Sequence, residues 1–179
     1  QVLGLANAGG DTINSVKAAN EFGITKTMKI AGLLVFITDV HAIGIQNAQG
    51  LLATEAWYWD QNDQTRKFAK RFFEKMKRMP TMVQAGNYSS TMTYLNAVKA
   101  AGTSDSDKVM QQLRKVKIND MFTKNGYIRK DGTMVHDMYL YEVKSPSEVK
   151  SPWDYYKLVA TVPGEKAFAP EAYSQCANK

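Results

Sequence analysis

The stretch that decides the fold class is QVLGLANAGGD, residues 1–11. Val2 to Asn7 is predicted as a buried strand, and residues 8–11 as a tight turn that leads into a helix. Apolar residues then recur on one helical face: Ile13, Val16, Ala19 and Phe22. A chain that opens directly on a strand, without a start methionine or a signal peptide, indicates the C-terminal part of a longer protein.

Strand and helix patterns continue to alternate up to residue 56. The expected elements are a strand at residues 28–36, a short helix at roughly 40–48 and a strand at 51–56. Asp11 or Thr12 is expected to cap the first helix, and Gly23 to end it in the left-handed conformation. Thr38 and Asp39 are cap candidates for the second helix. This alternation predicts an α/β fold with a parallel sheet covered by helices.

After Trp57 the pattern changes to consecutive helices. They are expected at about residues 63–78, 87–101 and 105–115, with no full strand between them. Two strands follow, at residues 138–143 and 155–162, and they are predicted to pair as a hairpin across an exposed loop. The tail from Pro163 is expected to be irregular.

This order predicts a chain that passes between two lobes. Residues 1–54 are assigned to part of one lobe and residues 55–135 to part of the other. Residues 136–179 are expected to return to the first lobe and to end in a C-terminal tail. The segment Ala53–Asp60, where a strand runs into an aromatic cluster, is a candidate hinge.

The composition excludes several classes of protein. Hydrophobic residues make up 44% of the chain and charged residues 22%, which is typical of a globular domain. No run approaches the roughly 18 apolar residues of a membrane span. The net charge is +6, but the densest basic cluster, residues 66–78, has helical spacing and is interpreted as a solvated helix face. We therefore expect no nucleic-acid partner.

Residues suited to catalysis or metal binding are few and scattered. The two histidines, His41 and His136, are far apart, and neither belongs to a cluster with metal-ligand spacing. His41 is interpreted as a capping or packing residue, with ligand contact as the alternative. No nucleophile elbow or phosphate-binding lysine loop occurs, and the single cysteine, Cys176, has no partner within the chain. We predict a protein that is not an enzyme and uses no metal or cofactor.

The geometry of the sheet then indicates where a ligand would bind. In open α/β sheets, ligands bind beyond the carboxyl ends of the strands. The segments expected there are residues 7–11, 35–39 and 57–59, which offer small residues, a phenyl ring, hydroxyl and carboxyl groups and two indoles. This set suits a small, partly apolar ligand with a polar head. For Trp57 and Trp59, packing within the hinge is the alternative.

Several stretches resemble a known family. LANAGGDT (residues 5–12) and FITDVHAIG (36–44) look like the second half of an ABC-transporter periplasmic solute-binding protein of the branched-chain-amino-acid (leucine/isoleucine/valine-binding) type. DGTMVHDMYL (131–140), with PWDYYK (152–157) after it, is similar to an aromatic-acid-binding subgroup common in proteobacteria. The resemblance covers essentially the whole chain.

The resemblance implies a type I periplasmic-binding-protein fold, in which two Rossmann-like lobes joined by three crossovers close on a ligand. Two crossovers are expected in this chain, near residues 53–57 and 135–138. The resemblance also implies a periplasmic location and an ABC-transporter permease as partner. The N-terminal part of the same protein would supply most of one lobe.

One departure from the family pattern bears on the ligand. Amino-acid-binding members place a carboxylate for the ammonium group where this chain has Leu33 or Leu34, and an aromatic residue near Ala8. An ammonium group buried without a carboxylate costs on the order of several kcal/mol. We therefore expect an aromatic carboxylate as ligand, unless Asp39 or Asp11 replaces the missing acid. A branched-chain or other amino acid is the alternative.

The expected ligand-binding residues come from three parts of the chain. Phe36 and Trp57 are expected to pack on the ring, and Gln84 is included because it precedes the helix carrying Tyr88, where this family's first lobe faces the cleft. The full set is Asn7, Ala8, Phe36, Thr38, Asp39, Trp57 and Gln84. Two other functions compete: a sensor domain, which needs a following membrane or kinase segment, and an α/β enzyme, which needs a nucleophile–base pair.

Overall fold

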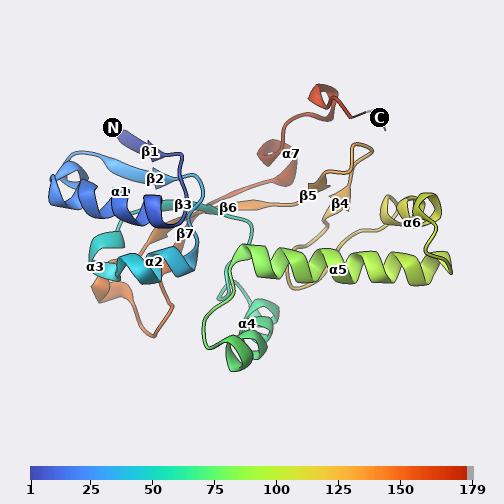
Figure 1. Ribbon diagram of the computed structural model, residues 1–179, viewed down its shortest axis with the longest axis horizontal. Helices are drawn as coiled ribbons and strands as arrows, with labels where there is room; N and C mark the ends of the chain where they lie inside the picture. The colour runs from blue at the N-terminus through green and yellow to red at the C-terminus, as the bar shows by residue number, and fades with distance from the viewer. Residues whose placement is uncertain (177–179) are drawn as a thin grey trace.

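The computed structural model describes residues 1–176 and shows a chain folded around two hydrophobic cores. Figure 1 shows one body built on a sheet and a second built mainly from helices. The elements of the first body are β1 (Val2–Leu5), α1 (Gly10–Glu21), β2 (Lys29–Gly32), α2 (Ile37–Ile43), α3 (Ile45–Ala48), β3 (Leu52–Glu55), β6 (Met138–Val143) and β7 (Tyr156–Val162). Those of the second are α4 (Asp63–Met76), α5 (Met82–Ala101), α6 (Ser106–Leu113), β4 (Tyr127–Ile128), β5 (Met134–Val135) and α7 (Gly164–Ala167).

The central sheet has five strands in the order β1-β2-β3-β6-β7. The first three strands run parallel, with Leu5 opposite Gly32 and Gly32 opposite Ala53. β6 lies antiparallel beside β3 and forms a hairpin with β7. The predicted α/β fold and the predicted hairpin are confirmed.

One face of this sheet carries the first core. Because side chains alternate along a strand, Ile30, Ala53 and Val143 share the face that packs against Val16 of α1 and Val40 of α2. Figure 1 shows α1, α2 and α3 together on that side. Full burial of each aliphatic side chain contributes about 1.5–3 kcal/mol, so this layer holds the parallel strands in register.

The second core lies beyond the end of β3. It consists of Ala56, Trp57, Phe68, Ala69, Ala85 and Phe122. Its two main helices begin at capping residues, as polar side chains there satisfy free N–H groups. The Asn62 side chain accepts from the N–H groups of Gln64 and Thr65 at 2.9 and 3.1 Å, and α4 follows.

The chain passes between the bodies after β3, before β6 and again after β7. At the third passage the Gly164 N–H donates to Asp137 Oδ1 at 3.0 Å, and Phe168 meets the ring of His136 edge-on at 5.1 Å. α7 therefore lies beside β5. The division into lobes at residues 54 and 135 stays a proposal, and these contacts favour counting residues 164–168 with the second body.

The predicted strand at residues 28–36 was wrong in its second half. The strand ends at Gly32, and Leu33 and Leu34 are 62% and 43% exposed. The chain turns so sharply that a Cβ at Gly32 would lie 2.2 Å from Cγ2 of Val35. Continuous apolar character is consistent with a buried strand, but the turn brings only Val35 back into the core.

The predicted helix boundaries also needed correction. α1 begins after Gly9, without a side-chain cap from Asp11 or Thr12, although Gly23 has the expected left-handed φ of 70°. The helix expected at residues 40–48 is two short helices, which are separated at Gly44. The tail expected to be irregular contains α7 and a short 3₁₀ turn.

Candidate ligand-binding site

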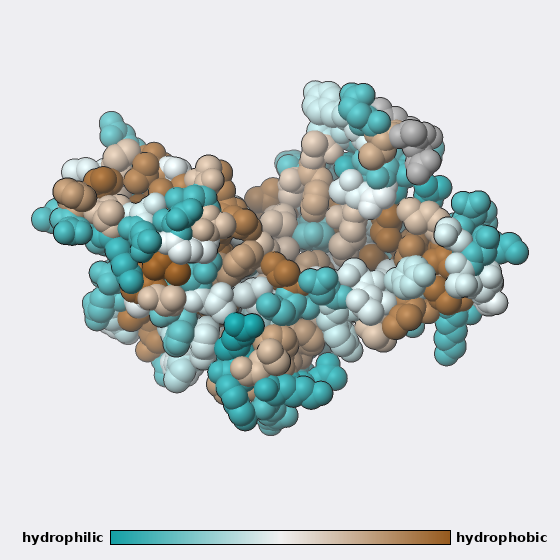
Figure 2. All heavy atoms as spheres, viewed as in Figure 1, coloured by the Kyte–Doolittle hydropathy of each residue, from teal (hydrophilic) through white to brown (hydrophobic). Residues whose placement is uncertain are grey.

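The carboxyl ends of the parallel strands lie at one edge of the first body. Figure 2 shows a hollow between the two bodies, and in Figure 1 β1 runs toward it. The loop after β1 carries Asn7 and Ala8, and the segment after β2 carries Phe36, Thr38 and Asp39. Because β1 and β2 are parallel neighbours, the structure brings these two predicted segments to the same edge.

Asn7 fastens the loop after β1 to helix α1. Its Nδ2 donates to Ser15 Oγ at 3.1 Å, and its Oδ1 accepts from Thr12 Oγ1 at 2.8 Å. Thr12 is completely buried, so it holds the amide in one orientation. Ala8, the next residue, is exposed, and its methyl group covers little of the loop backbone. Asn7 therefore shapes the loop, and Ala8 offers contact surface.

The segment before α2 is organised by a carboxylate. Asp39 Oδ2 accepts from the Phe36 N–H at 2.9 Å, which caps the first turn of α2. The carboxylate near a helix N-terminus is also favoured by the helix dipole. Phe36 and Thr38 are half-buried at this turn. They are the ring and hydroxyl groups available for a ligand at this edge.

Trp57 lies inside the second core and is only 1% exposed. Its Nε1 donates to the Met121 carbonyl at 2.9 Å, and its ring meets Phe68 edge-on at 5.8 Å. This position agrees with the alternative interpretation of Trp57, in which the side chain packs within the protein and does not contact the ligand. A ligand in the hollow does not reach a side chain so enclosed without rearrangement of the core.

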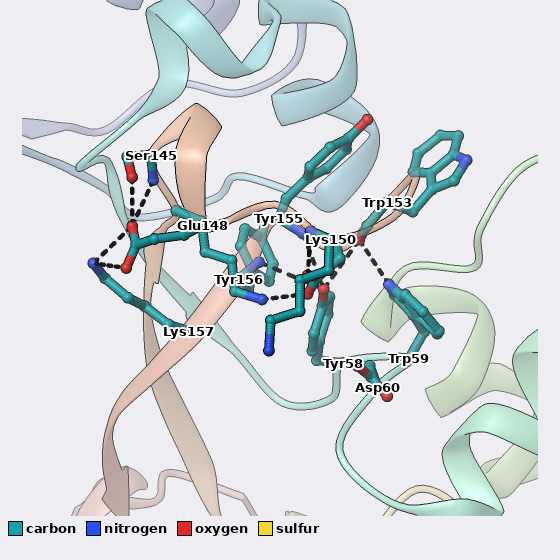
Figure 3. A network of polar contacts seen from close by, with 12 residues as sticks. Tyr58, Trp59, Asp60, Ser145, Glu148, Lys150, Trp153, Tyr155, Tyr156 and Lys157 are labelled. Atoms are coloured by element: carbon teal, nitrogen blue, oxygen red, sulfur yellow. Dashed lines mark hydrogen bonds and ion pairs between the residues drawn. The ribbon is translucent and has the colours of Figure 1, made fainter.

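Trp59, two residues later, lies between the cores and packs against both. Its Nε1 donates to the Trp153 carbonyl at 2.9 Å, and the Tyr58 hydroxyl donates to the same carbonyl at 3.0 Å. The Tyr58 oxygen in turn accepts from the Tyr155 N–H at 3.1 Å (Figure 3). Trp153 has a φ of 70°, which costs a non-glycine residue about 1–3 kcal/mol. This network fixes the crossover after β3 to the loop before β7.

Gln84 lies in the second body and acts as a cap. Its Oε1 accepts from the N–H and the hydroxyl of Thr81 at 2.7 and 2.6 Å, at the start of α5. This capping box explains why α5 begins at Met82, ahead of the predicted residue 87. The polar oxygen of Gln84 is therefore engaged with Thr81, and the start of α5 lies beside the end of β3, where the Ala56 N–H donates to Met82 Sδ at 3.2 Å.

Glu55 is a residue of this region that the sequence argument missed. It is the last residue of β3 and only 2% exposed. Its Oε1 accepts from the Tyr156 hydroxyl at 3.3 Å, whereas Oε2 has no partner within residues 1–176. Burial raises the pKa of Glu55 well above its ordinary value, and nearby Asp39 adds to the shift. The sequence did contain a signal for this residue: Glu55 is an acid at the end of an otherwise largely apolar strand, directly before the aromatic residues 57–59.

Both histidines have packing roles in the structure. His41 stacks on Trp153 with ring centroids 4.0 Å apart, and its Nδ1 lies 2.8 Å from the Tyr155 hydroxyl. His136 contacts the rings of Phe122 and Phe168 edge-on. Within residues 1–176, no three His, Cys, Asp or Glu side chains are grouped in a way that could hold a metal ion.

Comparison with known proteins identifies the family. Residues 1–148 match the model of a family described as periplasmic binding protein. The chain belongs to this family. A periplasmic binding protein from Burkholderia mallei is 62% identical, with a TM-score of 0.93 over 99% of this chain and 47% of that one. No curated protein matched. The type I periplasmic-binding-protein fold is thereby shown.

Two other similar structures belong to solute-binding proteins described with different ligand classes. A branched-chain amino acid ABC transporter periplasmic ligand-binding protein from Burkholderia xenovorans LB400 is 43% identical, with a TM-score of 0.91 over 99% of this chain and 48% of that one. An ABC-transporter solute-binding protein from Rhodopseudomonas palustris BisB5, bound to 3,4-dihydroxybenzoic acid, is 17% identical, with a TM-score of 0.72 over 92% of this chain and 45% of that one. The latter likeness shows the fold alone. The chain spans about half the length of these structures.

Proposed function

We propose that this chain is part of a periplasmic solute-binding protein that delivers a small ligand to an ABC importer. The observation that carries the proposal is the pair of separate cores joined at the Glu55–Trp57 crossover, with a hollow between the two bodies (Figure 2) toward which β1 runs (Figure 1). Two bodies on a hinge can close around a ligand and expel water from it. Family membership supports this mechanism.

The proposed ligand is an aromatic carboxylate. Leu33 and Leu34 are exposed where β2 ends, so this part of the edge offers apolar surface and no acid. Phe36 adds a ring and Thr38 a hydroxyl. An aromatic ring gains from burial against such surface, whereas the ammonium group of an amino acid would lose water without gaining a carboxylate there.

The residues divide into contact and support roles in this proposal. Ala8, Phe36 and Thr38 contact the ligand. Asn7 and Asp39 hold the two loops, because their polar atoms are engaged with Thr12, Ser15 and the Phe36 N–H. Trp57 and Gln84 stabilise the second body, Trp57 through its bond to the Met121 carbonyl and Gln84 by capping α5. The remaining contacts come from the part of the protein outside this chain, which also completes the lobes.

The proposed partner is the permease of the importer, and the proposed location is the periplasm. No helix within residues 1–176 combines the length and the apolar character needed to cross a membrane. No enzymatic role is proposed, because family members bind and hand over solutes. An amino acid remains the second candidate ligand, and the buried acid Glu55 near Asp39 is the observation that favours it.

Titration calorimetry of the intact protein with 4-hydroxybenzoate, a hydroxycinnamate and leucine tests the ligand class. We expect micromolar or tighter binding of an aromatic acid and none of leucine. Phe36→Ala should weaken binding about tenfold or more, because it removes the ring contact. Phe22→Ala, at an exposed site on the far end of α1, is the control. Submicromolar leucine binding with no response to aromatic acids would restore the amino-acid assignment.

A further inference from the structure

A second pocket lies at the hinge, apart from the hollow at the strand ends. Its volume is about 380 Å³, which is within the range of small-molecule sites. Its walls come from the β6–β7 hairpin, from residues 58–62 of the crossover and from residues 120–124 of the second body. None of the residues proposed to contact ligand at the strand ends lines this pocket.

The pocket contains hydrogen-bond donors that lack acceptors. The Tyr139 hydroxyl makes no hydrogen bond within residues 1–176, and the Tyr141 hydroxyl accepts from Gln61 Nε2 at 2.8 Å, which leaves its own hydrogen free. Burial raises the pKa of Tyr139 and of Tyr141, so both keep their hydrogens at neutral pH. Lys124 is an exposed lysine that lines the pocket; its Nζ donates to Gln64 Oε1 at 3.0 Å and forms no ion pair with an acid within residues 1–176.

The acids of the pocket, in contrast, already have partners. Asp154 forms an ion pair with Lys144, and Asp60 forms one with Arg66 at 2.8 Å. Asp120 accepts three hydrogen bonds from its own surroundings. The pocket therefore has a surplus of donors, and an occupant that supplies acceptors would satisfy them.

We propose that this hinge pocket binds a small carboxylate on a planar ring. The carboxylate accepts hydrogen bonds from Tyr139 and Lys124, and the ring packs against Leu158, which lines the pocket and is 55% exposed. A charge-assisted bond to Lys124 is stronger than one between neutral groups, and contact of the ring with an aliphatic side chain adds to the burial of apolar surface. The site does not rest on the ligand proposed for the strand-end hollow.

The position of the pocket gives its occupant a regulatory effect. Tyr139 belongs to the sheet of the first body, whereas Lys124 belongs to a loop of the second. A ligand that contacts both favours the relative orientation in which the two groups are close. Occupancy of the hinge pocket and of the hollow are therefore coupled, and each ligand changes the affinity for the other by the same factor.

Crystals of the intact protein grown with 4-bromobenzoate locate the site, because the anomalous signal of bromine marks the ring. We expect a bromine peak between Tyr139 and Lys124, whether or not another appears at Phe36. Absence of a peak in the hinge pocket would overturn the inference. A peak there without one at Phe36 would support the inference and count against the ligand proposed for the hollow.

Calorimetry with 4-bromobenzoate in solution tests the two donors. Tyr139→Phe and Lys124→Met should each weaken the binding of 4-bromobenzoate at the hinge pocket about tenfold. The affinity of the hollow for the same ligand should not change. Lys115→Met, at an exposed lysine outside the pocket, is the matched control. A crystal peak with no millimolar or tighter binding in solution would mean binding at crystal concentration only. That result, or equal affinity in all three variants, contradicts the proposal.

Discussion

Glu55 carries a buried carboxyl group with one unpaired oxygen, so its protonation affects stability. Its pKa is raised in the folded protein, so the folded state binds the proton more tightly than the unfolded one. Its favourable contribution is complete below the ordinary value of 4.5 and is lost as the pH rises toward the folded pKa. We expect Glu55→Gln to gain stability relative to the unmodified intact protein between pH 5 and pH 8, measured by urea denaturation.

Glu142 is the matched control for this experiment, because its pKa moves the other way. Lys29 and Lys157 pair with it at 2.7 and 3.1 Å and lower its pKa. Its contribution is therefore present above the ordinary pKa and lost as the pH falls, so Glu142→Gln should lose stability at pH 8, by at most about 1 kcal/mol for a surface pair. Equal pH profiles for the two variants would show that Glu55 is not buried as described.

Single residues show where prediction from the sequence stops. Phe36 was predicted as the last residue of a strand and Thr38 as a cap candidate for the next helix; in the structure β2 ends at Gly32, Phe36 is the N-cap of α2 and Thr38 lies in its first turn. Trp57 could not be separated from Trp59 in the same way. Trp57 is enclosed by the second core, whereas Trp59 packs against both cores, and this difference depends on contacts with Met121 and Trp153, which are distant in sequence.

At the scale of elements, Gly32 sets the end of β2 and the shape of the site. A Cβ there would meet the Val35 side chain at 2.2 Å, whereas a Cβ at Gly4 of the neighbouring strand meets nothing within 4 Å. We expect Gly32→Ala to destabilise the intact protein by about 1–3 kcal/mol and to weaken ligand binding. Gly4→Ala should change thermal stability by less than about 1 kcal/mol. Equal melting temperatures would contradict this role for Gly32.

Elements with strong local signals were predictable, and those set by distant contacts were not. The strand Met138–Val143 was predicted with its observed bounds, and the helix predicted from residue 63 begins there. The apolar run Leu33–Phe36 misled the prediction, because its fate depends on a steric contact between Val35 and Gly32. The helix start at Met82 was missed because the Thr81–Gln84 capping box was not recognised.

At the scale of the molecule, much apolar surface of the second body is uncovered. Helix α5 exposes five large apolar side chains, Val83, Tyr88, Met92, Tyr94 and Leu95, and a contiguous exposed apolar surface of this kind usually marks an interaction face. Because the chain spans about half the length of the similar structures, we expect the remainder of the protein to cover this helix and the free edge of β1.

The isolated chain of 179 residues should therefore bind a hydrophobic dye and unfold without a sharp transition. The intact protein should leave the dye unbound and melt cooperatively, because its apolar faces are covered. Dye fluorescence and calorimetric melting of both proteins make the comparison. The expectation would be contradicted by an isolated chain that is monomeric, unfolds in one cooperative transition and gives no increase in dye fluorescence.

The central claim is that a ligand is held between the two bodies at the carboxyl ends of β1 and β2. The most direct measurement is a crystal structure of the intact protein with 4-hydroxybenzoate. We predict density for the ligand between the bodies, with its ring on Phe36 and within hydrogen-bond distance of Thr38. Absence of ligand density at Ala8, Phe36 and Thr38 at a saturating concentration, whether or not the hinge pocket is occupied, would contradict the claim.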